Sequence, residues 1–309
     1  MLQMKPLYRQ LLALSLALVL ALGIALPALG EAPPPKVVFQ ADGQLLPPQD
    51  SGLSLYVLPL LGADCMLLHD HGQWMLVDMG RRKDYPHIKE LLERLGVDKI
   101  DIAFNTHPHS DHIGGMVPLI EDYPVDRFVT VFRKNLTGPS ILQISTIKAL
   151  DRAKIPVERM NSGDSFTLGQ AQVEIFKTSH QNVNGASAVL RVTYGDTSLL
   201  LAADINRVAQ DRLAHDHGSA LAADVLKYPH HGQEKLDDDF TEAVSPAFAL
   251  ITNGSIKSAD GQKWLGRHNI PFAFSTWGVI SLYADGQTIQ ISQELTDEGR
   301  GYKERFKPQ

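Results

Sequence analysis

The sequence predicts an α+β protein in which two β-sheets pack face to face and helices cover their outer faces, a four-layer αββα sandwich. Strand hairpins occur in both halves of the chain, and amphipathic helices are interleaved with them. Hydrophobic residues make up 44% of the 309 residues, which is the share of an ordinary globular core. Because the hairpins interrupt the alternation of strand and helix, two packed sheets fit better than one doubly wound sheet.

The first half of the chain opens with strands and then alternates with helices. The turn Asp70-His71-Gly72 joins two strands as a hairpin. Apolar residues recur at helical spacing over 88–95, and Gly96 is a good helix stop. These patterns predict strands over 53–61, 65–69, 73–77, 100–105 and 127–132, and helices over 86–95, 115–121 and 140–152.

The second half is rich in β-structure from residue 166 to 203 and alternates again after that. Short apolar runs between turn residues indicate the strands, and longer periodic runs indicate the helices. The predicted strands cover 172–178, 186–194, 198–203, 223–228, 248–251, 272–275, 279–283 and 288–292, and the predicted helices cover 207–214, 240–244 and 262–267.

Residues 1–30 have the features of a secretory signal peptide. Lys5 and Arg9 precede an apolar run over 11–28, and Ala28-Leu29-Gly30 offers small residues for cleavage before Glu31. An uncleaved membrane anchor is the alternative, because an apolar run of this length nearly spans a bilayer. Cleavage predicts a periplasmic or secreted protein with no stable membrane association. The remaining chain divides into an extended segment over 31–51, one folded domain over 52–295 and a C-terminal tail over 296–309.

The charge balance disfavours a general nucleic-acid-binding role. The formal net charge is −6, and loss of Lys5 and Arg9 with the signal peptide takes it to −8. An acidic surface does not attract polyanions over a long range. A small molecule is therefore the favoured partner, and a nucleic acid would need a local basic patch.

The number of histidines is the unusual feature of the composition. Twelve histidines stand against one cysteine, Cys65, which excludes an internal disulfide and a cysteine-based zinc cluster. Directly after a predicted strand, residues 106–115 read Thr-His-Pro-His-Ser-Asp-His-Ile-Gly-Gly. Imidazole and carboxylate groups are ligands for zinc and neighbouring divalent metals. In an extended segment His107 and His109 point the same way, and Asp111 and His112 can address a second ion.

Further ligands must come from later strand ends. His180 follows the strand over 172–178, and Asp204 ends a strongly apolar strand, where it can also cap the next helix. Pro229-His230-His231-Gly232 follows the strand over 223–228. Four strands that each end in histidine or aspartate predict one shared metal site.

The motif His-x-His-x-Asp-His, followed by an aspartate after an apolar strand and then by histidine, resembles the metallo-β-lactamase fold hydrolases. In detail it looks most like the competence (DNA-internalisation) branch and its phosphorylcholine-esterase relatives. Residues 76–80 match their Ile-Asp-Thr-Gly, 199–205 match Leu-Leu-Thr-Gly-Asp-Ile, 224–232 match Asp-Val-Leu-Lys-Val-Pro-His-His-Gly, and 275–280 resemble Thr-Asp-x-x-Gly-x-Ile. The likeness runs from about residue 52 to 292 and implies the αββα metallo-β-lactamase fold for the domain.

The resemblance implies two divalent metal ions, zinc in the first place, with manganese or iron as alternatives. It also implies that Asp78 orients the metal-bound histidines. The first metal would be held by His107, His109 and His180, and the second by Asp111, His112 and one of His230 or His231, with Asp204 bridging the two.

The implied activity is that of an exported hydrolase of a phosphoester or phosphodiester, with a metal-bridging hydroxide as nucleophile. Asp111 would orient the hydroxide, and whichever of His230 and His231 is not a ligand would stabilise the developing oxyanion. Hydrolysis of a lactam, lactone or thioester is an alternative, as is metal binding without hydrolysis. The sequence departs from the branch pattern at three places: Gln233 stands in place of serine, Ala203 stands in place of glycine, and the Gly-His-Pro loop is missing near 263–268.

Overall fold

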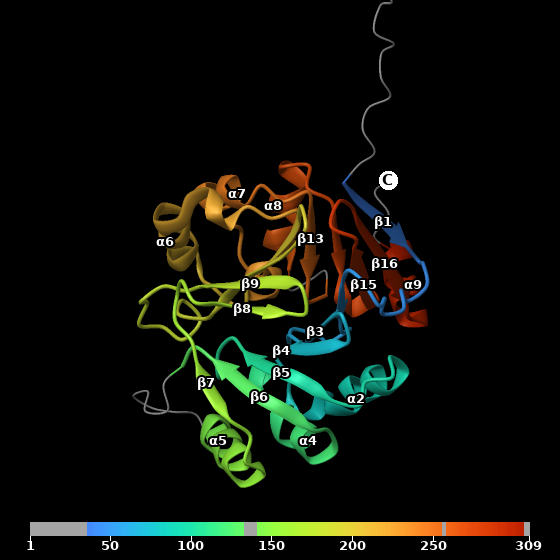
Figure 1. Cartoon of the computed structure of the whole chain (residues 1–309). Helices are drawn as coiled ribbons and strands as arrows, with labels where there is room; N and C mark the ends of the chain where they lie inside the picture. The colour runs from blue at the N-terminus through green and yellow to red at the C-terminus, as the bar shows by residue number, and fades with distance from the viewer. Residues whose placement is uncertain (1–35, 133–140, 255–257, 306–309) are drawn as a thin grey trace, which may run out of the picture. The chain divides into compact units, whose positions relative to one another are not determined.

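The computed structural model describes residues 36–132, 141–254 and 258–305, and the expected signal peptide lies outside these ranges. The described residues form two packed β-sheets with helices outside, which confirms the predicted αββα architecture (Figure 1). None of the helices in these ranges is long and apolar enough to cross a membrane.

The larger sheet has nine strands, with antiparallel pairs at its centre and parallel pairs at both ends, where β1 pairs with β16 and β4 to β7 follow one another. β2, β3 and β4 pair antiparallel, while β4, β5, β6 and β7 are parallel. In spatial order its strands are β1 (Val37–Ala41), β16 (Ile289–Leu295), β15 (Gly278–Ala284), β2 (Leu53–Val57), β3 (Met66–Asp70), β4 (Gln73–Val77), β5 (Ile100–Asn105), β6 (Val125–Thr130) and β7 (Val157–Arg159).

The smaller sheet has seven strands, antiparallel at one end and parallel at the other. β8 to β11 form antiparallel hairpins, and β11, β12, β13 and β14 are parallel. In spatial order its strands are β14 (Phe272–Phe274), β13 (Phe248–Ile251), β12 (Val225–Lys227), β11 (Thr197–Leu201), β10 (Val189–Tyr194), β9 (Ala171–Phe176) and β8 (Ser165–Leu168).

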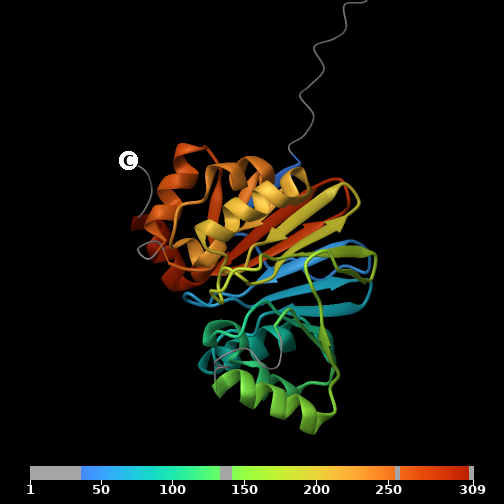
Figure 2. The ribbon, with the colours of Figure 1, turned by 90° about the vertical axis from the view of Figure 1, so that its left-hand side faces the viewer.

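Three apolar clusters fill the spaces between the layers. One lies between the sheets, and the other two lie between each sheet and its helices. Figure 2 shows the ribbon of these layers turned by 90°. Each fully buried large apolar side chain there contributes about 1.5–3 kcal/mol relative to an exposed one. The larger sheet is covered by α2 (Tyr85–Arg94), α4 (Met116–Asp122) and α5 (Ile141–Ala153), and the smaller by α6 (Arg207–His217), α7 (Asp238–Val244) and α8 (Ala259–Arg267).

Several elements differ from the sequence prediction. The short strands β1, β7 and β8 and the four-residue helix α3 (Ser110–Ile113) carry too few periodic residues to be predicted. The expected tail over 296–309 is instead helical over α9 (Asp297–Arg305). The helix forms because the Thr296 hydroxyl accepts a hydrogen bond from Gly299 N at 3.0 Å, and Thr296 N donates to the Trp277 carbonyl at 2.9 Å.

Candidate metal centre

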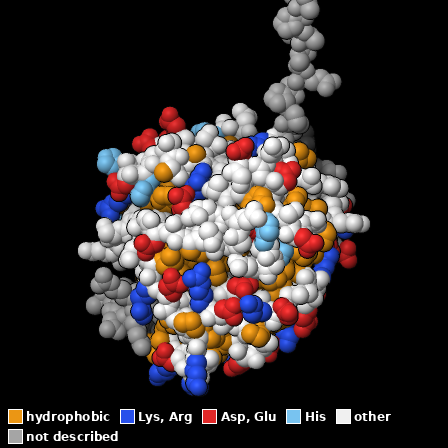
Figure 3. Space-filling view, in the orientation of Figure 1, with side chains coloured by type: hydrophobic (Ala, Val, Ile, Leu, Met, Phe, Trp, Pro, Cys, Tyr) orange, Lys and Arg blue, Asp and Glu red, His pale blue; other side chains and the backbone are white. Residues whose placement is uncertain are grey.

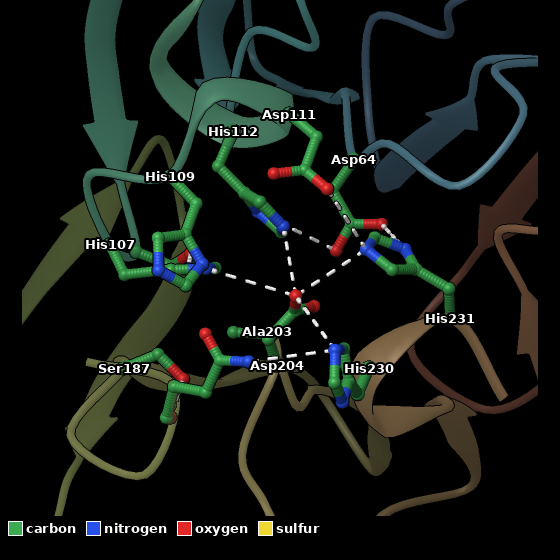
Figure 4. Close-up of polar contacts among 12 residues, drawn as sticks. Asp64, His107, His109, Asp111, His112, Ser187, Ala203, Asp204, His230 and His231 are labelled. Atoms are coloured by element: carbon green, nitrogen blue, oxygen red, sulfur yellow. Dashed lines mark hydrogen bonds and ion pairs between the residues drawn. The ribbon is translucent and has the colours of Figure 1, made fainter. Parts of the chain in front are cut away.

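Most of the predicted site residues meet where parallel strands of both sheets end. β5 runs into the segment with the histidine motif, β11 is followed by Asp204, and β12 runs into the turn η3 (Pro229–Gly232). Adjacent parallel strands end side by side, so their following loops share one crevice. Figure 4 shows the side chains facing a common centre.

Left-handed backbone at four non-glycine residues directs these strand ends toward the centre. The φ angle is +58° at Asp78, +44° at Ala203, +48° at His230 and +55° at His231. Such a conformation costs an L-residue about 1–2 kcal/mol. At Ala203, where the family pattern has glycine, the carbonyl accepts hydrogen bonds from His230 N and from Lys227 Nζ, both at 2.9 Å. These two contacts hold the residue in its strained conformation.

The Asp204 carboxylate is the centre of the cluster. Its Oδ2 atom lies 3.2 Å from His112 Nε2 and 3.4 Å from His231 Nε2. The Nε2 atoms of His107 and His230 lie farther away, at 3.8 and 4.0 Å (Figure 4). A carboxylate oxygen with four imidazole nitrogens around it has the position that a bridging ligand between two metal ions would take.

One complete set of ligand atoms consists of Asp111, His112 and His231. These atoms lie within 4.8 Å of one another, and His231 Nε2 is 3.8 Å from Asp111 Oδ2. These residues are among those expected for the second metal, and of the two neighbouring histidines His231 is the one in this group. His230 is more exposed, with 27% of its side chain accessible, and its Nε2 lies 3.5 Å from Asn184 Nδ2.

The set expected for the first metal is less complete. His107 Nε2 lies 3.1 Å from His109 Nδ1, so these two imidazoles converge as predicted. His180 belongs to none of the groups of potential ligands found among the described residues, and neither does His109. His180 Nδ1 accepts a hydrogen bond from Asn182 N at 2.9 Å, and the His180 ring lies against Gly185. The Nδ1 atom of His180 is thus engaged within its own loop.

Asp78 lies behind the cluster, as expected for a residue that orients a ligand. The Asp78 carboxylate is buried and accepts hydrogen bonds from Asn105 Nδ2, Thr106 N and Thr106 Oγ1 at 3.0, 2.8 and 2.7 Å. Its Oδ2 also lies 2.7 Å from His112 Nδ1. A proton on Nδ1 leaves the Nε2 lone pair of His112 facing Asp204, which is the tautomer that a metal needs.

Two buried charged residues at the centre were not predicted. Asp64, between β2 and β3, has its Oδ1 3.2 Å from His231 Nδ1, and its Oδ2 forms an ion pair with Lys227 Nζ. A lysine inside the apolar strand over 223–228 and an aspartate within an apolar run were the available signals. Lys227 lies within the matched segment 224–232, three residues before His230, but its charge was not assigned a role there. Asp64 lies far in the sequence from both Lys227 and the histidine motif, so the patterns could not connect it to them.

The titration properties follow from burial and from these charges. Burial opposes charge on His112, but Asp204 and Asp78 outweigh it and raise the His112 pKa well above its usual value. Burial also opposes the charge on Asp204, and His112 and His231 together hold the Asp204 pKa well below its usual value. Burial, with the charge of His112 second, lowers the pKa of His107. His107 is therefore neutral and free to act as a ligand.

Orphaned polar atoms show that the residues fit a metal. The buried Nε2 atoms of His112 and His231 and the Oδ1 atom of Asp204 have no hydrogen-bond partner in the described part of the chain. Unsatisfied buried polar atoms are costly unless a further group completes them. Imidazole nitrogens and carboxylate oxygens are the donors that zinc and related divalent ions prefer.

Comparison with known proteins places this centre in a family. The model of the metallo-beta-lactamase superfamily matches residues 58–246, which is more than half of the chain. Hydroxyacylglutathione hydrolases of Brucella ovis and Brucella abortus are 30% identical over 192 residues, covering 59% of this chain. The chain spans 66% of the length of these curated relatives. The finer likeness to the competence branch has no counterpart among them.

Solved structures show the same fold at low sequence identity. The metallo-beta-lactamase fold protein YhfI from Bacillus subtilis aligns with a TM-score of 0.51 and 13% identity, over 72% of this chain and 96% of its own. CmlA, a diiron beta-hydroxylase from Streptomyces venezuelae, aligns with a TM-score of 0.52 and 14% identity, over 77% of this chain and 55% of its own. With the family match and the centre described above, the chain belongs to the metallo-β-lactamase superfamily.

Proposed function

We propose that this chain is a hydrolase that works with two divalent metal ions. The observation that carries the proposal is the Asp204 Oδ2 atom, which has imidazole nitrogens of four histidines within 4.0 Å. His107 and His109 would hold one ion, Asp111, His112 and His231 the other, and Asp204 both. A bound pair of such ions supplies a nucleophile at neutral pH by lowering the pKa of water to about 7, and polarises the bond to be cleaved.

The residues around the ligands would orient and complete the reaction. Arg81 Nη2 lies 3.6 Å from Asp111 Oδ2 and donates to the Gly62 carbonyl, which fixes Asp111 at the mouth of the site. Asp111 is partly exposed and can accept a proton from an attacking water. His230 is not needed as a ligand, and its Nε2 accepts from the Asn184 amide at 3.5 Å. In its other tautomer His230 would donate from Nε2 to an oxygen of the substrate in place of that contact.

The favoured substrate class is a small phosphoester or phosphodiester. Asn184 Nδ2 donates to His230 Nε2 and has a second N–H for a substrate oxygen, and the other tautomer of His230 would add a second donor beside it. Phosphoryl groups present several acceptor oxygens for such donors. The resemblance of the sequence motifs to phosphorylcholine esterases supports the same class. A long nucleic acid is disfavoured, because Lys and Arg are mixed with Asp and Glu over the face in Figure 3 rather than gathered in one patch.

A thioester is the second candidate. The curated relatives at 30% identity are named hydroxyacylglutathione hydrolases, and their substrate name denotes a thioester of glutathione. The same centre can polarise a thioester carbonyl, because one superfold hosts several hydrolytic reactions. The two classes differ in the oxygens that His230 and Asn184 would contact, so replacement of His230 affects them to different extents.

A substrate panel tests the proposal. The protein without residues 1–30 is assayed with zinc or manganese on bis-p-nitrophenyl phosphate, p-nitrophenyl phosphate, single-stranded DNA, a hydroxyacylglutathione and nitrocefin. We expect metal-dependent turnover of a phosphate ester, lost in His107→Ala and retained in His180→Ala. Metal-dependent turnover of the thioester alone would replace the phosphoester assignment. Binding of two metal equivalents without turnover of any substrate would contradict the hydrolase proposal.

We also propose that the chain is exported and that residues 1–30 are removed. Lys5, Arg9 and the apolar run over 11–28 support this, together with small residues before Glu31. The test is mass spectrometry of the mature N-terminus after fractionation of the producing cell. We expect a chain that begins at Glu31 in the periplasm or medium, and a full-length chain in the membrane fraction would support the anchor instead.

A further inference from the structure

Lys227 is buried at the base of the metal centre. Of the lysines and arginines whose side chains the structure describes, only Lys227 is buried, with 0% of it exposed. Burying an ammonium group costs free energy unless partners compensate its charge. Apolar residues of similar volume in place of a buried ion pair often give the protein the same stability or more. Lys227 is the last residue of β12, just before the turn that carries His230 and His231. This position indicates that Lys227 has a role at the metal centre.

The Lys227 ammonium lies among three oxygen atoms of the centre. It forms an ion pair with Asp64 Oδ2 and donates to the Ala203 carbonyl at 2.9 Å. It also lies 3.8 Å from Asp204 Oδ1. Lys227 therefore fixes the strained residue that precedes Asp204, and it balances the charge of Asp64.

Asp64 in turn orients His231. Its Oδ1 lies 3.2 Å from His231 Nδ1, which Thr252 Oγ1 also contacts at 2.9 Å. The backbone N of Asp64 donates to the Asp111 carbonyl at 3.1 Å, so Asp64 is anchored to the segment that carries two ligands. A proton on His231 Nδ1 leaves Nε2 unprotonated and directed at Asp204, 3.4 Å away.

Asp64 could itself compete for a metal. Ligand atoms of Asp64, His112 and Asp204 lie within 4.8 Å of one another and form a group able to hold an ion. The ammonium of Lys227 contacts two of these three residues. The Lys227 ammonium thus forms an ion pair with the Asp64 carboxylate, which would otherwise be attracted to a metal ion.

We propose that Asp64 and Lys227 are a positioning pair for the second metal: Lys227 keeps the Asp64 carboxylate out of the metal shell, and Asp64 orients His231 toward it. The inference rests on the proposed function in one respect, that metal ions bind at this centre. It adds two residues outside the ligand set, and it predicts that they affect the second metal more than the first.

The test is the double variant Asp64→Leu/Lys227→Met, which removes both charges at similar volume. Replacing a buried ion pair by apolar residues often leaves stability unchanged or raises it, so we expect a metal-free urea midpoint at or above that of the parent protein. Zinc alone is titrated into the metal-free proteins in competition with a chromophoric chelator. We expect the second zinc equivalent to bind about 10–100-fold more weakly, the usual cost of losing an orienting partner. The first equivalent is expected to weaken less, because the variant touches the first metal only through Ala203 and Asp204, whereas it also removes the partner of His231.

A matched control uses an ion pair far from the centre. Arg127 on β6 and Glu158 on β7 lie 2.6 Å apart, and Arg127→Met/Glu158→Leu is expected to leave both zinc affinities unchanged. If the double variant at the centre does not fold, Asp64→Asn/Lys227→Met replaces it. That variant keeps an amide oxygen near His231 and is expected to lose about tenfold for the second equivalent, the low end of the same range.

Each outcome decides a separate question. Parent-like zinc affinities in a stable double variant would show that the pair is only structural and would overturn the inference. An equal loss of both equivalents would also overturn it, because orientation of His231 concerns one metal. If the parent protein takes up no zinc or manganese, the proposed function fails first, and the pair has no metal to position.

Discussion

Replacing Asp78 by asparagine tests whether the tautomer of one histidine controls metal binding. The Asp78 side chain receives two donors at Oδ1, and its Oδ2 faces Thr106 Oγ1 and His112 Nδ1 at 2.7 Å each. The asparagine side chain would keep the oxygen at the first position and place an NH2 group at the second. That group donates to His112 Nδ1, so the ring proton moves to Nε2, which faces Asp204 and can no longer bind a metal.

The expected magnitudes follow from these contacts. The Thr106 hydroxyl can turn and accept from the new amide, so one hydrogen bond to a charged group is lost, which costs about 1.5–3 kcal/mol of stability. Zinc affinity of the second equivalent should fall about 10–100-fold, or about 1.4–2.7 kcal/mol. Urea unfolding of the metal-free protein measures the first quantity, and zinc titration against a chelator measures the second.

Asp70 provides the matched control for this variant. It is also buried, its Oδ2 accepts from Gln170 N and Ala171 N at 2.6 and 2.8 Å, and its Oδ1 lies 2.5 Å from His71 Nδ1. We expect Asp70→Asn to lower stability by a similar amount and to leave zinc binding unchanged. Asp78→Asn with parent-like zinc affinity, or equal zinc losses in both variants, would refute the tautomer argument.

Three further predictions concern the ligands themselves. Asp204→Ala should bind neither zinc equivalent tightly and should lose activity, and metal-free turnover at the parent rate would contradict the mechanism. His180→Ala should retain two zinc equivalents, and loss of one would restore the sequence-based assignment of His180 as a ligand. The raised pKa values of His112 and His231 mean that zinc must displace protons there, so its affinity should rise with pH up to those values. The stability that these imidazolium groups confer on the metal-free protein is full below about pH 6.5 and is lost as pH rises through the raised pKa values. Calorimetry in buffers of different ionisation enthalpy counts the released protons, and zinc binding without proton release near pH 7 would contradict the assignment.

Strands and helices that are indicated by residues adjacent in the sequence were predicted well. The strands β4 and β5 and the strand β13 have the predicted boundaries, because turn residues flank continuous apolar runs. The strand predicted over 53–61 ends at Val57, since the chain leaves the sheet there to carry Asp64 into the centre. The edge strand β1 depends on pairing with β16, which lies far away in the sequence. Nothing near β1 indicates that partner.

The site shows the same division between local and distant signals. The cluster from His107 to His112 could be predicted because its ligands are neighbours in the chain. The choice between His230 and His231 could not, because both lie in one turn and both have left-handed φ angles. Burial separates them: 1% of the His231 side chain is exposed, against 27% for His230.

The balance of charge explains why this centre needs cations from several sources. Asp64, Asp78 and Asp204 are all buried within a few ångströms of the same histidines, while Lys227 supplies one fixed positive charge. Three buried carboxylates cannot remain ionised beside one ammonium without further positive charge. In the metal-free protein, protons on His112 and His231 provide it, which is the physical reason for their raised pKa values. Metal ions and protons therefore compete to balance the negative charge of these carboxylates. Lys227 already balances the charge of Asp64, so this carboxylate takes no part in the competition.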